Sequence, residues 1–129
     1  MMALLLALTA VSDCNAAAAR SGLDYRQCLG RAEQLADAEM VRQWRATLAS
    51  VRRENRENRG GNKPDLAQGL LASQRAWLRY RDAECAMIAE QAAGGTGFGE
   101  LAAECNITLT RRRTEMLRLR ELGRARYLR

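Results

Sequence analysis

The chain contains no histidine, the residue that most often serves as a general base and is the commonest metal ligand. We therefore expect no enzyme, no metal site and no cofactor. There is a single proline, Pro64, and there are only five valine and isoleucine residues against 23 alanines in 129 residues. Because alanine favours helices and β-branched residues favour strands, this composition predicts an all-α protein. The length allows one domain with a small core.

The first twelve residues, 1–12, carry no charge and are mostly apolar, but they are too few to span a bilayer as a helix. Ala10 and Ser12 are small residues at the two positions that a signal peptidase inspects, so we interpret 1–12 as part of a signal peptide cleaved before Asp13. The positive region that normally opens such a peptide is missing. Either translation starts upstream of Met1, or these residues form an apolar N-terminal helix. The interpretation leaves 13–129 as one helical domain with no transmembrane span.

Four cysteines follow this segment: Cys14, Cys28, Cys85 and Cys105. No pair has the two-residue gap of a zinc knuckle or a redox dithiol, and their even number after a signal peptide indicates disulfides formed in an oxidising compartment. Three pairings are formally possible. The midpoint of the first two cysteines falls at Ser21-Gly22 and that of the last two at Gly95, and residues equidistant from the turn of a helical hairpin lie opposite each other. We therefore predict the pairs Cys14–Cys28 and Cys85–Cys105.

Apolar residues recur every three or four positions from Leu29, which predicts a long helix with one buried stripe. The stripe consists of Leu29, Ala32, Ala36, Met40, Trp44, Leu48 and Val51. The helix ends in the polar run 52–59, before Gly60-Gly61. We interpret this run as a solvated helix end followed by a linker, with an interaction tail as the alternative.

Two more helices are predicted after the linker. The first begins with Pro64 in its first turn, has Asp65 near the positive end of the helix dipole, and runs to about Ala92. A glycine-rich turn, 94–97, separates it from a last helix that begins at about Phe98 and continues close to the chain end. The expected architecture is a small bundle of helical hairpins held by disulfides.

Facing residues in the second hairpin have numbers that sum to about 190, which places Trp77 at the level of Arg113. An arginine on this apolar face needs a partner. The Trp77 ring could supply a cation-π contact of about 1 kcal/mol, and Asp82 or Glu84 could supply a carboxylate. We interpret these contacts as structural rather than as a ligand site.

An ordered set of residues spans most of the chain. It comprises Asp13-Cys14, Cys28, 36–40, Trp44, Leu48, 74–85, Gly94-Gly95-Thr96, Cys105, Leu109-Thr110, Arg113, Thr114 and Leu117. This set resembles the lysozyme inhibitor LprI-like family of bacterial secreted domains. The resemblance implies a small, cysteine-bearing helical protein of the cell envelope, and the founding function of the family is inhibition of lysozyme. We interpret these motif residues as mainly structural: Trp77, Tyr80, Arg81, Asp82, Gly95, Leu109, Thr110 and Arg113.

The formal net charge is +6 and is unevenly distributed along the sequence. Residues 13–105 carry 13 basic and 13 acidic groups, whereas 106–129 carry eight arginines against Glu115 and Glu121. Familiar animal lysozymes are themselves basic, so an inhibitor would have to bind them through a neutral end. We expect that end to be the glycine turn, where Thr96, Phe98 and Glu100 could enter the sugar cleft of the enzyme. The alternative is a plain turn with Phe98 packed back on the helices.

The arginines of the last helix support a second hypothesis, an envelope adaptor without enzymatic activity. Arg111, Arg112 and their neighbours could bind anionic lipid, lipopolysaccharide phosphate, acidic wall polymers or another periplasmic protein. In a cytosolic protein Arg111-Arg112-Arg113 would be a candidate phosphate-binding strip for nucleic acid, a partner that we do not expect here. The alternative is a solvated helix face whose cations suit the negative end of the helix dipole.

Overall fold

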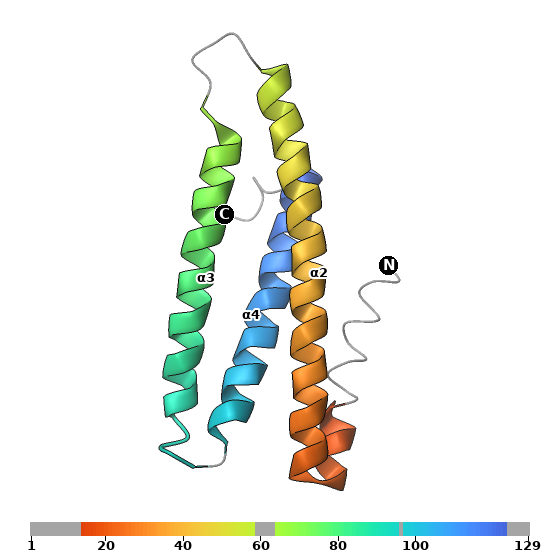
Figure 1. The fold of residues 1–129 in the computed structure, drawn as a ribbon, viewed down its shortest axis with the longest axis vertical. Helices are drawn as coiled ribbons and strands as arrows, with labels where there is room; N and C mark the ends of the chain where they lie inside the picture. Colours follow the sequence, from red (N-terminus) through yellow and green to blue (C-terminus); the bar gives the residue numbers. More distant parts are fainter. Residues whose placement is uncertain (1–13, 59–63, 96, 124–129) are drawn as a thin grey trace.

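The computed structural model describes residues 14–58, 64–95 and 97–123. The long helices are α2 (Gly22–Glu57), α3 (Leu66–Glu90) and α4 (Phe98–Glu121), and residues 14–20 are also helical (Figure 1). These three ranges contain no strand, which confirms the all-α prediction. The segment assigned to a signal peptide, the linker glycines Gly60-Gly61 and Thr96 lie outside them.

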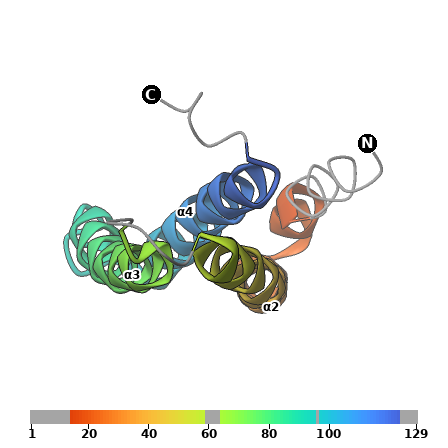
Figure 2. The ribbon, with the colours of Figure 1, turned by 90° about the horizontal axis from the view of Figure 1, so that it is seen from above.

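The three long helices run up, down and up, so that α2 and α4 point in the same direction and α3 in the opposite one (Figure 1). Seen from above, α4 lies between α2 and α3 (Figure 2). Helix α4 contacts both other helices extensively, whereas α2 and α3 contact each other least. Helix α4 is therefore the centre of the bundle.

Each helix begins where a short polar or small residue ends the preceding segment. The hydroxyl of Ser21 accepts a hydrogen bond from the backbone N–H of Asp24 at 3.0 Å, so Ser21 caps α2 at the predicted first turn. Helix α3 begins later than expected, because the Asp65 carboxylate accepts from the backbone N–H of Gln68 at 3.1 Å. Pro64 therefore precedes the cap instead of lying in the first turn.

Helix α4 ends at Glu121, earlier than the sequence pattern predicts. Gly123 has a φ of 70°, in the left-handed region that terminates helices and that only glycine adopts without cost. The expected helical positions of Tyr127 and Leu128 lie outside the described residues.

Both predicted disulfides are present. Cys14 pairs with Cys28 and Cys85 with Cys105, and the Cα atoms of each pair are 5.4 Å apart. The first bond joins the segment 14–20 to α2, and the second joins the end of α3 to the beginning of α4. Both crosslinks lie toward the same end of the bundle.

The core consists of two clusters that share the predicted stripe of α2. One cluster contains Met40, Val51, Ala67, Leu70 and Leu117, against which Trp44, Leu48 and Trp77 pack. The other contains Cys14, Leu29, Ala32 and Ile107, with Tyr25, Cys28 and Ala103 packed against it. All seven stripe residues are buried or half-buried, so the stripe prediction is confirmed.

Candidate functional site

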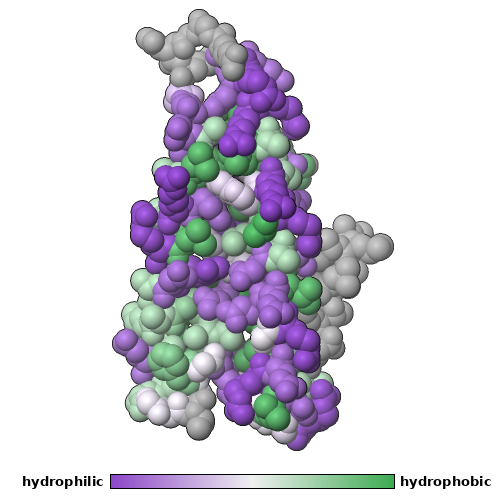
Figure 3. All heavy atoms as spheres, in the orientation of Figure 1, coloured by the Kyte–Doolittle hydropathy of each residue, from purple (hydrophilic) through white to green (hydrophobic). Residues whose placement is uncertain are grey.

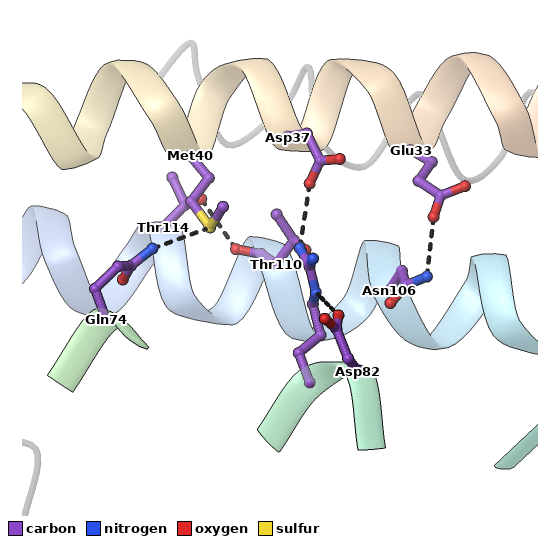
Figure 4. A network of polar contacts seen from close by, with 9 residues as sticks. Glu33, Asp37, Met40, Gln74, Asp82, Asn106, Thr110 and Thr114 are labelled. Carbon is purple, nitrogen blue, oxygen red and sulfur yellow. Dashed lines mark hydrogen bonds and ion pairs between the residues drawn. The ribbon is translucent and has the colours of Figure 1, made fainter. Parts of the chain in front are cut away.

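A layer of polar side chains crosses the bundle between the two core clusters (Figure 4). Its centre is Arg81 of α3, whose Nη1 lies 3.4 Å from Oδ1 of Asp37 on α2 and 3.3 Å from Oγ1 of Thr110 on α4. The Nε of Arg81 also donates to Oδ1 of Asp82 at 3.2 Å. One guanidinium therefore links all three helices at one level.

The indole ring of Trp77 contacts two arginines, Arg81 and Arg113. The Cζ atoms of Arg81 and Arg113 lie 5.2 Å and 5.9 Å from the centroid of the Trp77 ring. The predicted contact between Trp77 and Arg113 is therefore confirmed, and Arg81 is a second cation on the same ring.

Arg113 is only 7% exposed and is held by neutral partners. Its Nε donates to Oε1 of Gln74 at 2.9 Å, and its Nη2 donates to Oγ of Ser73 at 3.1 Å. Burial lowers the pKa of Arg113, and the positive charge of Arg120 lowers it further. Of the two carboxylates expected as possible partners on this face, Asp82 and Glu84, Asp82 pairs with Arg81.

Neighbouring side chains complete the layer. Thr110 is 1% exposed and its carbonyl accepts from the hydroxyl of Thr114 at 3.0 Å, while Asn106 donates to Glu33 at 2.9 Å. In the described part of the chain, no buried side-chain nitrogen or oxygen lacks a hydrogen-bond partner. The layer is thus saturated by its own residues, which favours a structural role over ligand binding.

The remaining motif residues lie outside this layer. Tyr80 is 54% exposed on α3, and Leu109 is half-buried on α4. Gly95 lies in the turn, where its N–H donates to the carbonyl of Ala92 at 2.9 Å and an added Cβ would lie 3.0 Å from that oxygen. The motif therefore combines packing residues, a turn residue and an exposed tyrosine.

Of the candidate partner-binding residues at the turn that the structure describes, Phe98 is exposed and Glu100 is half-buried. Phe98 begins α4 and remains 48% exposed, so it does not pack fully back on the helices. Glu100 lies in the first turn of α4, and its Oε1 is 3.5 Å from Nη1 of Arg26 on α2.

A second polar contact ties the beginnings of α2 and α4 together near the turn. The hydroxyl of Tyr25 donates to Oε1 of Glu104. This hydrogen bond, with partial burial and the nearby carboxylates of Glu104 and Glu100, raises the pKa of Tyr25 to about 12.

The charges divide at the polar layer. We call residues 14–37, 81–95 and 97–110 the disulfide half, and residues 38–58, 64–80 and 111–123 the opposite half. The disulfide half carries eight carboxylates and four arginines, a net charge of −4, whereas the opposite half carries six carboxylates and twelve arginines, a net charge of +6. The end that we expected to be neutral is therefore acidic.

The arginine run of α4 does not form one continuous strip. Arg112 is exposed and Arg111 half-buried, but Arg113 points into the bundle. Further along α4, Nε of Arg118 donates to Oε2 of Glu115 at 2.8 Å, and this bond lowers the pKa of the Glu115 carboxyl. The accessible cations near the run are thus fewer than the sequence implies.

A groove of about 520 Å³ lies in the opposite half, where the end of α2, the beginning of α3 and the end of α4 meet. Its lining includes Glu54, Leu70, Ser73 and Arg120. Sequence reasoning did not find this groove, because its lining residues come from three separated segments and form no local motif. It also missed Gln74 and Ser73 as partners of Arg113, although both lie about one turn of helix before Trp77 on α3.

Residues 14–58, 64–95 and 97–123 contain neither a membrane-spanning helix nor a metal-binding cluster. No helix there combines the length and apolar character needed to cross a membrane. Likewise, no group of three or more acidic or cysteine side chains is arranged there to hold a metal ion.

Comparisons with known proteins place the chain in a family. The family described as lysozyme inhibitor LprI matches residues 14–117, which include both disulfides and the polar layer. An uncharacterized protein of Rhizobium meliloti (strain 1021) is 31% identical over 108 residues, covering 82% of this chain and 76% of the relative. No solved structure shows significant similarity. The chain belongs to the lysozyme inhibitor LprI family.

Proposed function

We propose that the protein is a periplasmic or secreted binding protein that inhibits a wall-degrading lysozyme by covering the substrate cleft. The observation that carries this proposal is the family match over residues 14–117. Two disulfides support an oxidising compartment outside the cytoplasm. The chain itself needs no chemistry for this role, because a rigid partner that excludes substrate is sufficient.

The turn between α3 and α4 offers the best surface for such binding. The Cys85–Cys105 disulfide anchors both helices beside it, so the exposed Phe98 is presented by a covalently fixed frame. A preorganised apolar anchor loses little conformational entropy on binding, which is typical of residues that dominate interface energies.

Lysozyme assays at physiological salt test the proposal. Purified, oxidised protein should inhibit hydrolysis of cell-wall substrate by at least one of several lysozyme types. Phe98→Ala should weaken inhibition by about 1–2 kcal/mol, roughly 5- to 30-fold, without lowering thermal stability. Met116→Ala removes a similarly exposed side chain, 46% exposed, in the opposite half and is the matched control. Unchanged hydrolysis at large molar excess against all types would refute the proposal.

The second candidate function is an envelope adaptor that binds an anionic surface through α4. The net charge of +6 in the opposite half favours it, with Arg112 and Arg120 exposed. The protein should bind vesicles containing anionic lipid, and binding should fall as salt rises. Arg112→Gln/Arg120→Gln should weaken retention, while equal retention would refute this function. Arg113 is left intact because it is buried.

A further inference from the structure

The acidic disulfide half has carboxylates around its exposed turn. Glu90 is the last residue of α3 and is exposed, and Glu104 is exposed on α4. Glu100, between them in sequence, is half-buried with its side chain 25% exposed, and it makes a long ion pair of 3.5 Å with Arg26. Of these three carboxylates, within the described part of the chain, only Glu100 is paired with a cation, and the Glu104 carboxylate accepts from a neutral phenol, so the negative charge at this end is largely uncompensated.

Apolar side chains accompany these carboxylates. Met87 and Phe98, on either side of the turn in sequence, are 52% and 48% exposed. Hydrophobic atoms gather over the C-terminal part of α3, at the lower left of the space-filling view (Figure 3). An exposed apolar patch with a charged rim is typical of a protein-binding surface.

The charge that a partner meets depends on which half it approaches. Helix α2 has 36 residues and is about 54 Å long at 1.5 Å per residue. The Debye length in physiological salt is about 8 Å, so the charges of one half are screened from the far end of the bundle. A partner at the turn therefore meets mainly charges of the disulfide half, whose net charge is −4, rather than the formal net charge of +6.

We propose that the disulfide half, with the exposed side chains of Met87 and Phe98 and the carboxylates of Glu90 and Glu100 near its turn, docks on the basic surface of a lysozyme. This inference rests on the proposed function and specifies its partner as a lysozyme of high positive charge. The overall positive charge of the chain does not oppose such binding. It orients the approach, because the opposite half repels a basic partner and the turn attracts it.

Binding measurements at several salt concentrations test this inference. The probes are a basic animal lysozyme and the same enzyme with its amines succinylated, which makes it acidic. The variants are Glu90→Gln/Glu100→Gln in the disulfide half and, as the matched control, Glu54→Gln/Glu57→Gln at the exposed end of α2. Both double variants add the same charge to the chain, so only the position of the change differs.

The wild type should bind the basic enzyme and not the succinylated one, and binding should weaken as salt rises. Glu90→Gln/Glu100→Gln should weaken binding roughly fivefold, mainly through slower association, and Glu54→Gln/Glu57→Gln should leave it within about twofold. Thermal melts of both variants should match the wild type, which separates loss of binding from loss of fold.

Each contrary result has a distinct meaning. If the two double variants had equal effects, or if binding did not depend on salt, the proposal of an acidic docking surface would be overturned. The proposed function would still hold in that case, provided that the protein inhibits the enzyme. Inhibition of an acidic or neutral lysozyme without binding to the basic one would also overturn this inference alone. Inhibition of no lysozyme would overturn the proposed function and this inference with it.

Discussion

The two halves of the bundle are held together by different means. In the disulfide half, the core cluster is small and contains Cys14 and Ala32 beside Leu29 and Ile107, and both crosslinks lie there. In the opposite half, Met40, Leu70 and Leu117 form a core against which both tryptophans pack, without a disulfide among the described residues. Covalent bonds thus stabilise the part of the bundle where small side chains bury little apolar area.

The same division separates the surfaces. The disulfide half is acidic and presents an exposed turn, whereas the opposite half is basic and contains the groove between the helix ends. A covalently fixed, acidic end and a basic end with a larger core are suited to different partners. The comparison shows why the net charge of the chain is a poor guide to what either end can bind.

Reduction of both disulfides should change the relative stability of the two halves more than any other treatment. Each closes a loop whose crosslink stabilises the fold by about 3 kcal/mol in the chain-entropy model. Reduced protein should melt at a much lower temperature and lose amide protection first in 14–37, 81–95 and 97–110. Uniform loss of hydrogen-exchange protection over both halves would contradict the division.

Leu117→Ala should be the most damaging single change to the opposite half. Leu117 is 1% exposed, so truncation leaves a cavity and should lower the free energy of unfolding by about 3 kcal/mol, measured by urea denaturation. Met116→Ala, at an exposed position on the same helix, is the control and should cost less than about 0.5 kcal/mol. Similar losses for both variants would show that α4 is not packed in this register.

Arg113→Ala should destabilise the protein by about 1–3 kcal/mol, because it leaves Oε1 of the buried Gln74 without its donor and removes a cation from the Trp77 ring. Arg112→Ala should change stability by less than about 0.5 kcal/mol, since that side chain is exposed. Thermal or urea unfolding measures both. If Arg113→Ala left the free energy of unfolding unchanged, the structural role of Arg113 would be refuted.

Asp37→Asn tests the weakest link of the polar layer. The Asp37 side chain is 52% exposed, so its ion pair with Arg81 should contribute only about 0.2–1 kcal/mol. The effect should shrink in high salt, measured by urea unfolding at two ionic strengths. A loss as large as that of Arg113→Ala would mean that Asp37 is essential to the orientation of Arg81.

Alkaline titration should give the smallest effect, on the contact of Tyr25 with Glu104. The pKa of Tyr25 is raised from 10.0 to about 12 in the folded protein, so the neutral phenol is favoured by folding. Its contribution to stability is complete below pH 10 and is lost as the pH rises to about 12. Ultraviolet titration of the phenols should show a late component that Tyr25→Phe removes. Titration of every tyrosine near pH 10 would contradict the contact.

Local patterns were sufficient to predict much of the fold. The stripe from Leu29 to Val51 identified the buried face of α2, because helical periodicity is a property of neighbouring residues. The pairing of cysteines followed from their equal distances from Ser21 and Gly95, because each hairpin closes over a short stretch of chain. Facing residues of the second hairpin have numbers that sum to about 190, and this relation correctly placed Arg113 beside Trp77.

The candidate site was harder to predict. Sequence indicated Phe98 and Glu100 as accessible residues near a turn, but it gave that end no net charge. The carboxylates that make it acidic come from α2, α3 and α4, and the directions of the three helices decide which of them lie together. The arginines of α2 and α3 likewise join those of α4 only after folding.

The sequence by itself determined the helical class, the turns and the disulfide pairs, because each depends on interactions between residues close along the chain. The tertiary structure alone decided that Arg113 is buried while Arg112 is exposed, and that the two ends carry opposite charge. These features depend on how each helix is rotated and which ends meet. Such choices are made by packing between segments that are distant in the sequence.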